Sequence, residues 1–530
     1  MQESQASWKE SLEAFLHPRV VVMLVLGFSA GIPILLIFSS LSLWLREAGV
    51  ERADITFFSW AALGYSFKFV WAPLVDQLPL PWLSRLLGRR RSWLLLAQLA
   101  IIAAIGTMAS IDPALGQEGQ VAMALAAVAL GFSSATQDVV IDAYRIEAAD
   151  TRLQGMMSAA YIAGYRVAMV VAGAGALVIA SGFGTELGNY HYEAWRNTYW
   201  IMMLAMLIGV ATTLMIKEPE ASAQRNYHHS ALEYSRFLVL FALSLSGFIV
   251  CFYLTSGVAQ ALKVQLSALL LNDALASFLI EILRFCIAGS VSFLLAKVLL
   301  VSGLVQRSMV DETYVAPVRE FFQRYGKGTA LLLLLLVGSY RISDIILGVI
   351  SNVFYLDMGF SKQQIATAVK TFGVAMAIFG GFLGGLLAMR QGVMRILFLG
   401  ALLSAITNLL FMILADQGAD LLWLYIVVAA DNLSAGLAGA AFVAFLSSLT
   451  NISFTAMQYA IFSSLMTLLP KILGGYSGSI VDSVGYEWFF IFTTLVGLPV
   501  LLLIVVANRW LPIASLDSNV TKKAVAVNSG

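Results

Sequence analysis

Long apolar runs separated by short polar stretches occupy most of this chain. The runs are about 20 residues long, the length that an α-helix needs to cross a bilayer. We predict membrane spans near residues 20–45, 55–75, 92–111, 120–143, 155–181, 197–216, 236–256, 277–305, 329–356, 363–388, 393–414, 420–447, 456–480 and 487–508. The pattern predicts an all-α integral membrane protein with about fourteen spans.

A weak internal repeat divides these spans into two groups of six. Leu12–Leu16 before the first span resembles Val318–Phe322 before the ninth, and the segment that begins at Gln154 resembles the one that begins at Gln458. Two such halves, related by an axis along the membrane normal, are the architecture of major facilitator transporters. We therefore predict a major-facilitator bundle of 12 core helices with 2 inserted helices between its halves.

The predicted boundaries follow from this division. An interfacial helix is expected near residues 7–16, since its apolar positions have helical spacing. The other predicted parts are an N-terminal half at 1–217, a central linker with the two extra helices at 218–313, a C-terminal half at 314–510 and a polar tail at 511–530.

Composition excludes several classes of function. Of 530 residues, 60% are hydrophobic and only 12% are charged, unlike a soluble domain. The net charge of +1 gives no reason to expect nucleic-acid binding. The sequence has no phosphate-binding loop for ATP, no enzymatic motif and no cysteine or histidine spacing for a metal, so we expect no cofactor.

Basic residues are sorted between the loops in a way that predicts the orientation. With the N-terminus inside, the cytoplasmic loops collect most of the arginines and lysines, including Arg89–Arg91. This bias predicts that both termini are cytoplasmic. The residues before Val20 are polar and carry no cleavable signal, so the first apolar run is expected to remain as a span.

Carboxylates inside the predicted spans are candidates for proton coupling. Asp138 and Asp142 are four residues apart and share a helix face, with Arg145 three residues further on. Carboxylates at membrane depth are costly and are natural proton carriers. The candidate coupling residues are Asp138, Asp142, Asp344 and Asp431.

Further polar residues within the spans suit an anionic substrate that carries sugars. Arginine and lysine donate hydrogen bonds to carboxylates, amides can bind hydroxyl groups, and aromatic rings offer flat faces to sugar rings. The candidates are Lys68, Gln137, Tyr165, Arg166, Arg341, Asn352, Lys370, Asn432, Gln458 and Lys471. The alternative for each charged residue is a buried ion pair that fixes helix packing.

The loop after the second span resembles the major-facilitator signature. Ala72–Asp76 is followed by Gly88–Arg91, with Ala72 where glycine is usual and an inserted segment at 77–87. We expect Asp76 to cap a helix or pair with arginines in a cytoplasmic gate formed by Asp76, Arg89, Arg90 and Arg145. The alternative is that the arginines only anchor the cytoplasmic side of the membrane. The corresponding segment of the second half, Gly384–Arg390, lacks the aspartate.

Motifs over nearly the whole chain, apart from residues 221–306 and the tail, resemble the AmpG permeases. They are Gly27–Pro33, Phe67–Asp76, Gly88–Trp93, Ala135–Tyr144, Gly164–Met169, Ala441–Ala444 and Phe454–Gln458. The resemblance implies an importer in the bacterial inner membrane that is driven by the proton-motive force. Its substrates would be N-acetylglucosaminyl-1,6-anhydro-N-acetylmuramyl peptides for peptidoglycan recycling and, in some bacteria, β-lactamase induction.

Other functions remain open at this point. The chain could carry another anion, such as a peptide or an acyl-carrier cofactor, or be a membrane sensor that does not transport. We expect a monomer whose partners are the small-molecule substrate, protons and the bilayer. The inserted pair near 236–305 carries few internal charges, so we expect it to pack at the periphery of the bundle.

Overall fold

A computed structural model describes residues 13–50, 63–80, 82–149, 151–185, 188–220, 230–270, 273–474 and 477–511. In these residues, twelve helices are long and apolar enough to cross a membrane, which confirms the predicted helical membrane protein. The second predicted span lies partly outside the described residues, and the thirteenth is a shorter apolar helix. The total of about fourteen spans therefore stays a prediction. Most of the expected interfacial helix and tail also lie outside the described residues.

The chain divides into two compact units. One contains residues 1–225 together with 320–530, and the other contains residues 226–319. The first unit thus holds the two predicted six-helix halves except for residues 314–319, which belong to the second unit.

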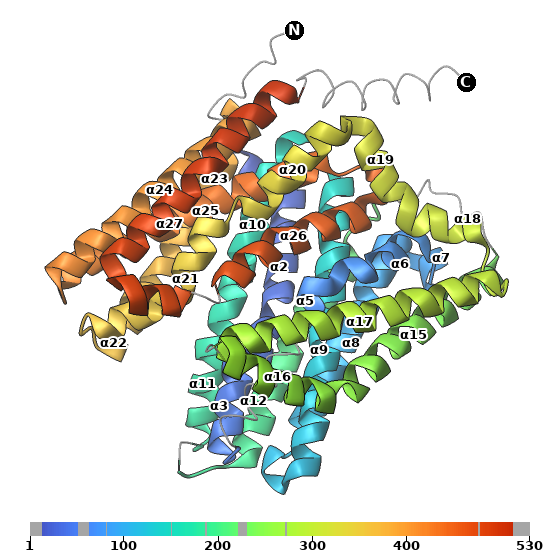
Figure 1. The fold of residues 1–530 in the computed structure, drawn as a ribbon, viewed down its shortest axis with the longest axis horizontal. Coiled ribbons are helices and arrows are strands. Elements are labelled where there is room, and N and C mark those ends of the chain that lie inside the picture. The colour runs from blue at the N-terminus through green and yellow to red at the C-terminus, as the bar shows by residue number, and fades with distance from the viewer. Residues whose placement is uncertain are drawn as a thin grey trace. The chain divides into compact units, whose positions relative to one another are not determined.

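The N-terminal half begins the first unit (Figure 1). Its helices are η1 (Ala14–Leu16), α2 (Pro18–Ile37), α3 (Ser39–Glu47), α5 (Leu63–Phe67), η3 (Lys68–Val70), α6 (Ala72–Gln77), α7 (Leu83–Leu87), α8 (Arg89–Ala109), η4 (Pro113–Leu115), α9 (Gln117–Ala148), α10 (Thr151–Val170), η5 (Val171–Gly175), α11 (Ala176–Gly182), α12 (Tyr192–Ala205) and α13 (Leu207–Met215). The second span is broken around Lys68, and Pro73 then lies in the first turn of α6. Proline fits there because its missing N–H would be unpaired in that turn.

Helices α2 and α10 pack so closely at their glycines that the two backbones are in contact. A Cβ atom added to Gly27 would lie 2.2 Å from the carbonyl oxygen of Tyr161, and one added to Gly164 would lie 1.9 Å from that of Leu24. Small residues allow such close approach in lipid, where helix association depends on packing. This pair forms a closely packed core for the half that carries Asp138 and Asp142.

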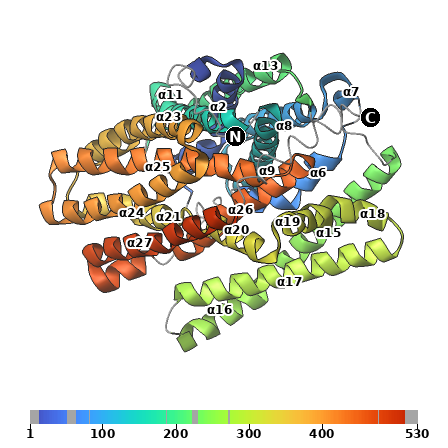
Figure 2. The same ribbon diagram turned by 90° about the horizontal axis from the view of Figure 1, so that it is seen from above.

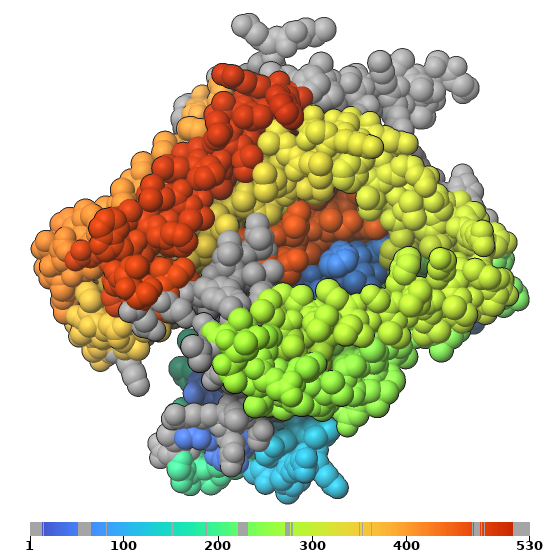
Figure 3. All heavy atoms as spheres, viewed as in Figure 1, coloured from blue at the N-terminus to red at the C-terminus, as the bar shows by residue number. Residues whose placement is uncertain are grey.

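The C-terminal half completes the first unit. Its helices are α20 (Lys327–Ser339), α21 (Ile342–Asp357), α22 (Lys362–Ile365), η7 (Ala366–Phe372), α23 (Gly373–Gln391), α24 (Val393–Gln417), α25 (Leu421–Leu449), η8 (Ile452–Phe454), α26 (Thr455–Gly474) and α27 (Ser477–Trp510). Helix α25 lies between α23 and α24 (Figure 2). Helix α27 packs along α24, where the red and orange atoms form a continuous surface (Figure 3).

The second unit is a helical hairpin with a lead-in to the C-terminal half. It contains α15 (Ala231–Leu254), α16 (Ser256–Leu270), α17 (Asp273–Val301), α18 (Arg307–Val310), η6 (Asp311–Val315) and the start of α19 (Ala316–Tyr325). Glu281 joins the helices, since it pairs with Lys263 at 2.6 Å and with Arg284 at 2.8 Å. Two of the twelve candidate spans come from this unit. Its predicted peripheral position stays a prediction.

The two halves of the first unit share a buried interface. Leu386, Ala456 and Ala460 of the C-terminal half belong to one apolar cluster with Val139 and Met156 of the N-terminal half. This cluster lies at the end of the bundle that also carries the loop between α6 and α8, hereafter the Asp76 end. The two halves therefore meet closely at this end.

Gly385 packs closely against the other half at this interface, and we predict that Gly385→Ala will separate the halves there. A Cβ at Gly385 would lie 2.8 Å from the Gly155 carbonyl oxygen, whereas one at Gly381 would find its nearest neighbour at 3.8 Å. Because overpacking costs about 1–3 kcal/mol, the closed population should fall about tenfold. Gly381→Ala is the matched control.

The measurement is the distance between spin labels at the opposite end of the bundle. Leu115→Cys and Leu422→Cys introduce exposed labelling sites in a chain whose Cys251 and Cys286 are replaced by serine. Gly385→Ala should shorten the label distance, because the halves rock as rigid bodies. An unchanged distribution would show that Gly385 does not control closure.

Candidate functional site

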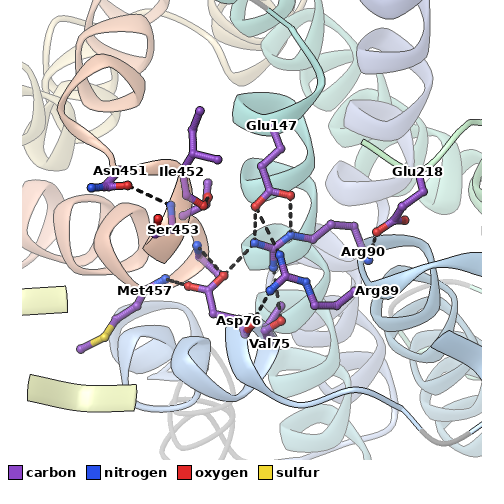
Figure 4. Close-up of polar contacts among 12 residues, drawn as sticks. Val75, Asp76, Arg89, Arg90, Glu147, Glu218, Asn451, Ile452, Ser453 and Met457 are labelled. Carbon is purple, nitrogen blue, oxygen red and sulfur yellow. Dashed lines mark hydrogen bonds and ion pairs between the residues drawn. The ribbon is translucent and has the colours of Figure 1, made fainter. Parts of the chain in front are cut away.

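Asp76 joins the two halves through its carboxylate. Its oxygens accept hydrogen bonds from the backbone N–H groups of Ala456 at 3.1 Å and Met457 at 2.9 Å, at the start of α26. Figure 4 shows Asp76 pointing from α6 toward that helix terminus. The arrangement suits a negative charge, because a helix N-terminus has unpaired N–H groups and a positive dipole end.

A buried ionic network holds Asp76 in place (Figure 4). Arg90 Nη2 lies 2.7 Å from Asp76 Oδ1 and 2.5 Å from Glu147 Oε1. Arg89 pairs with Glu147 at 3.6 Å and donates a hydrogen bond to the Asp76 carbonyl oxygen. Glu218 accepts hydrogen bonds from the backbone N–H groups of Arg90 and Arg91 at 2.8 and 3.1 Å. Helices α8 and α9 and the segment after α13 thus support the contact with α26.

Arg145 makes a second connection between the halves. Its guanidinium is fully buried and donates hydrogen bonds from Nη1 to Ser158 at 3.1 Å and to Ser447 of α25 at 2.7 Å. It also lies over the ring of Tyr459 in α26, 5.2 Å from the centroid. Its Nη2 lies 3.4 Å from Asp142 Oδ1, so one cation contacts both a coupling candidate and the other half.

The coupling candidates of α9 form a cluster with a cation. Lys68 Nζ lies 3.9 Å from Asp142 Oδ2, and the Tyr161 hydroxyl donates to Asp138 Oδ1 at 3.2 Å. Asp138 also interacts electrostatically with Lys68 and Asp142. Lys68, Asp138 and Asp142 are each 7–8% exposed. The structure therefore brings two carboxylates and one lysine together in a largely dehydrated place.

A second group of charges lies in the other half and faces Arg166 of α10. Arg341 pairs with Asp344 at 3.8 Å, and Asp431 interacts electrostatically with both. Arg166 interacts electrostatically with Arg341 and with Lys370, whose side chain is exposed. Within the described part of the chain, Arg166 makes no hydrogen bond or ion pair. Arg166 and Arg341 thus bring cations from the two halves near each other, and only Arg341 has a carboxylate partner among the described residues.

The other predicted binding residues are placed differently. Gln137 is fully buried and accepts a hydrogen bond from Ser29, while Gln458 contacts Glu320, Arg324 and Asn451. We leave both glutamines out of the proposed site because protein groups surround them. Tyr165 and Asn432 are half-buried, and the Asn432 amide donates to the Val428 carbonyl oxygen. The side chains of Asn352 and Lys471 lie outside the described structure.

Sequence reasoning missed the acidic partners at the Asp76 end. Glu147 and Glu218 follow the ends of predicted spans, where acidic residues are common. Only the fold shows that both carboxylates bind the Arg90 segment. A motif within one half also cannot identify Ser447, since this partner belongs to the other half. In the described residues, no group of three histidine, cysteine or acidic side chains could hold a metal.

We predict that Asp76→Asn will open the Asp76 end. The substitution removes the charge that Arg90 and the start of α26 share, and breaking a buried pair costs about 3–5 kcal/mol. Ala159 is buried between the halves. Ala159→Cys should therefore be alkylated at least about tenfold faster in the Asp76→Asn background.

Glu218→Gln is the matched control for this prediction. Glu218 contacts the same arginine segment, but its described partners all lie in the N-terminal half. It should leave the alkylation rate near that of the parent. Equal rates in all three proteins would mean that Asp76 does not hold the halves together.

Comparison of protein sequences relates the chain to transporters. Residues 19–216 match a family model described as acetyl-coenzyme A transporter 1. The chain is 28% identical to the putative transporter AmpG 4 of Rickettsia felis over 491 residues, or 93% of this chain and 97% of that protein. It is 27% identical to the anhydromuropeptide permease of Escherichia coli K12 over 509 residues, or 96% and 83% of the two chains. These matches confirm the resemblance to AmpG proteins.

Solved structures show the same fold at low sequence identity. The proton:xylose symporter XylE superposes with a TM-score of 0.57 at 11% identity, covering 93% of this chain and 95% of that one. The Escherichia coli fucose:proton symporter FucP gives 0.57 at 8% identity, covering 93% and 99%. The predicted major-facilitator fold is therefore confirmed. These relatives are permeases and symporters and not enzymes, as the sequence predicts.

Proposed function

The chain is a multi-pass membrane transporter with the major-facilitator fold, and we propose that it imports anhydromuropeptides together with protons. The substrates are N-acetylglucosaminyl-1,6-anhydro-N-acetylmuramic acid and its peptides. They move from the periplasm across the bacterial inner membrane for peptidoglycan recycling. The relation to the Escherichia coli anhydromuropeptide permease over most of both chains supports this substrate class.

Two neighbouring arginines, one from each half, of which only Arg341 has a described carboxylate partner, are the observation that carries the proposal. Arg166 on α10 and Arg341 before α21 interact electrostatically, and the contact of Arg341 with Asp344 is as long as 3.8 Å. Both arginines are half-buried, and a charge that is partly withdrawn from water is stabilised by a partner of opposite charge. The carboxylates of a muropeptide would supply that partner, and arginine can hold a carboxylate through two hydrogen bonds.

Proton coupling is assigned to the cluster around Asp142. Asp138 and Asp142 lie beside Lys68 and are largely excluded from solvent. Carboxylates in such a place can gain and lose protons during transport. Asp344 and Asp431, near Arg341, are the corresponding candidates in the second half.

Alternating access would follow from closure at the Asp76 end. Asp76, Arg89, Arg90 and Arg145 form the gate on that side, which the distribution of basic loops predicts to be cytoplasmic. With this orientation, the described contacts between Asp76 and α26 belong to an outward-facing state. Protonation and substrate binding would then favour opening of the gate to the cytoplasm.

Transport of an acyl-coenzyme A is the second candidate, because the family model matched by the N-terminal half carries that description. Uptake of a labelled anhydromuropeptide tripeptide into proteoliposomes tests both. Our proposal predicts uptake that unlabelled anhydromuropeptide blocks and that excess acetyl-coenzyme A leaves unchanged. Uptake of labelled acetyl-coenzyme A in place of the anhydromuropeptide would favour the second candidate, and absence of uptake of both compounds would favour a sensor.

A further inference from the structure

Arg145 is shared between a proton-coupling candidate and the interface of the two halves. On one side it contacts Asp142, at 3.4 Å from Nη2 to Oδ1. On the other side it donates to Ser447 of α25 at 2.7 Å and lies over the ring of Tyr459. A side chain in this position can transmit a change of charge at Asp142 to the contact between the halves.

The hydrogen bonds of Arg145 are incompletely satisfied. Its Nε is buried and has no hydrogen-bond partner among the described groups. Its contact with Asp142 is long for a charge-assisted hydrogen bond, whose usual length is about 2.7–2.9 Å. The contacts to Ser158 and Gln154 come from α10 in the same half and do not depend on closure. The hydrogen bonds of the buried Arg145 guanidinium can therefore rearrange.

The charges that face Asp142 determine what its protonation would do. Lys68 approaches from η3 at 3.9 Å, Arg145 and Asp138 lie on α9, Tyr161 lies on α10, and the Tyr459 hydroxyl from α26 interacts with the carboxylate. A neutral Asp142 would leave Lys68 and Arg145 near each other with one anion fewer between them. Repulsion between like charges is strong where water is excluded.

We infer that Arg145 is a positioning residue that links protonation of Asp142 to opening of the Asp76 end. An ionised Asp142 holds the Arg145 guanidinium against Ser447 and Tyr459, and the halves stay closed. Protonation removes the anion, the guanidinium turns away, and the contact with α25 and α26 is lost. This inference rests on the proposed proton coupling, and it names the group through which that coupling reaches the gate.

The test is the pH dependence of the distance between spin labels at Leu115→Cys and Leu422→Cys. These sites are exposed and lie on the two halves, at the end opposite to Asp76. In the wild-type background, acidification should shorten the distance as the Asp76 end opens. Arg145→Gln should remove at least about half of this pH-dependent shift, and Asp142→Asn should give the low-pH distribution at every pH.

Arg324→Gln is the matched control. Arg324 also contacts a glutamine, Gln458, and a backbone carbonyl, that of Leu449, and all of its described partners lie in the C-terminal half. It should retain the wild-type pH response. If Arg145→Gln does not fold, the pair Ser447→Ala and Tyr459→Leu removes the hydrogen bond to α25 and the aromatic ring beneath the guanidinium, and it should reduce the response in the same way.

The outcomes separate this inference from the proposed function. A wild-type pH response that Arg145→Gln leaves intact overturns the role of Arg145 and leaves proton coupling standing. If the label distance in the wild-type protein does not change with pH, protonation does not open the Asp76 end and the inference is wrong. Loss of the response in Arg145→Gln but not in Arg324→Gln is the result we expect.

Discussion

Asp142→Asn is expected to abolish proton-driven accumulation of substrate while exchange of substrate across the membrane persists. The amide keeps the shape of the side chain but cannot exchange a proton, so the gradient no longer drives the cycle. For one proton per substrate, a gradient of about one pH unit supports accumulation of about tenfold. The Asn variant should lose this accumulation completely. Asp138→Asn should have the same effect if the two carboxylates act as one coupled site.

The measurement compares accumulation with exchange in the same proteoliposomes. Glu118→Gln changes an exposed carboxylate on the same helix α9 and should behave like the parent. Full accumulation in both Asp138→Asn and Asp142→Asn would remove these residues from the coupling mechanism.

Arg166→Lys is expected to impair uptake of substrates that carry a peptide. Lysine keeps the positive charge but loses the planar fork that binds both oxygens of a carboxylate. A lost charge-assisted hydrogen bond is worth about 1.5–3 kcal/mol, so the apparent affinity should fall at least about tenfold. Titration of initial uptake rates with the labelled tripeptide measures this change.

Two controls make the Arg166 prediction specific. Arg196→Lys replaces an arginine that pairs with Glu193 at 3.3 Å in α12, away from the charged clusters, and should leave affinity unchanged. The disaccharide without a peptide has fewer carboxylates, so Arg166→Lys should affect it less. An equal loss for both substrates would place Arg166 away from the peptide.

The sequence was sufficient to predict the membrane helices and the kind of contact that Asp76 makes. Apolar runs of about 20 residues indicate spans whatever their neighbours, because the bilayer sets their length. The Asp76–Arg90 pair could be expected because both residues belong to one short motif. The sequence also suggested that Asp76 caps a helix. In the structure its carboxylate accepts hydrogen bonds from backbone N–H groups at the start of α26.

Partners from distant segments could not be predicted. Arg145 and Ser447 are separated by about 300 residues, and only the packing of α9 against the C-terminal half brings them together. Gln458 illustrates a second difficulty. A polar residue in an apolar span suggests ligand binding, although its side chain can instead bind groups of the protein. In the structure it accepts a hydrogen bond from the Asn451 N–H, close to the end of α25. Gln154, its repeat equivalent, donates to the carbonyl oxygen of Ala149 after α9.

Substrate-driven proton movement tests the central claim most directly. Proteoliposomes containing a pH-sensitive dye, with the membrane potential clamped and no initial pH gradient, receive an anhydromuropeptide tripeptide on the outside. The proposed function predicts that the lumen acidifies as labelled substrate enters, and that Asp142→Asn abolishes the acidification while exchange continues. Entry of the tripeptide into the parent proteoliposomes without acidification of the lumen would contradict proton-coupled import.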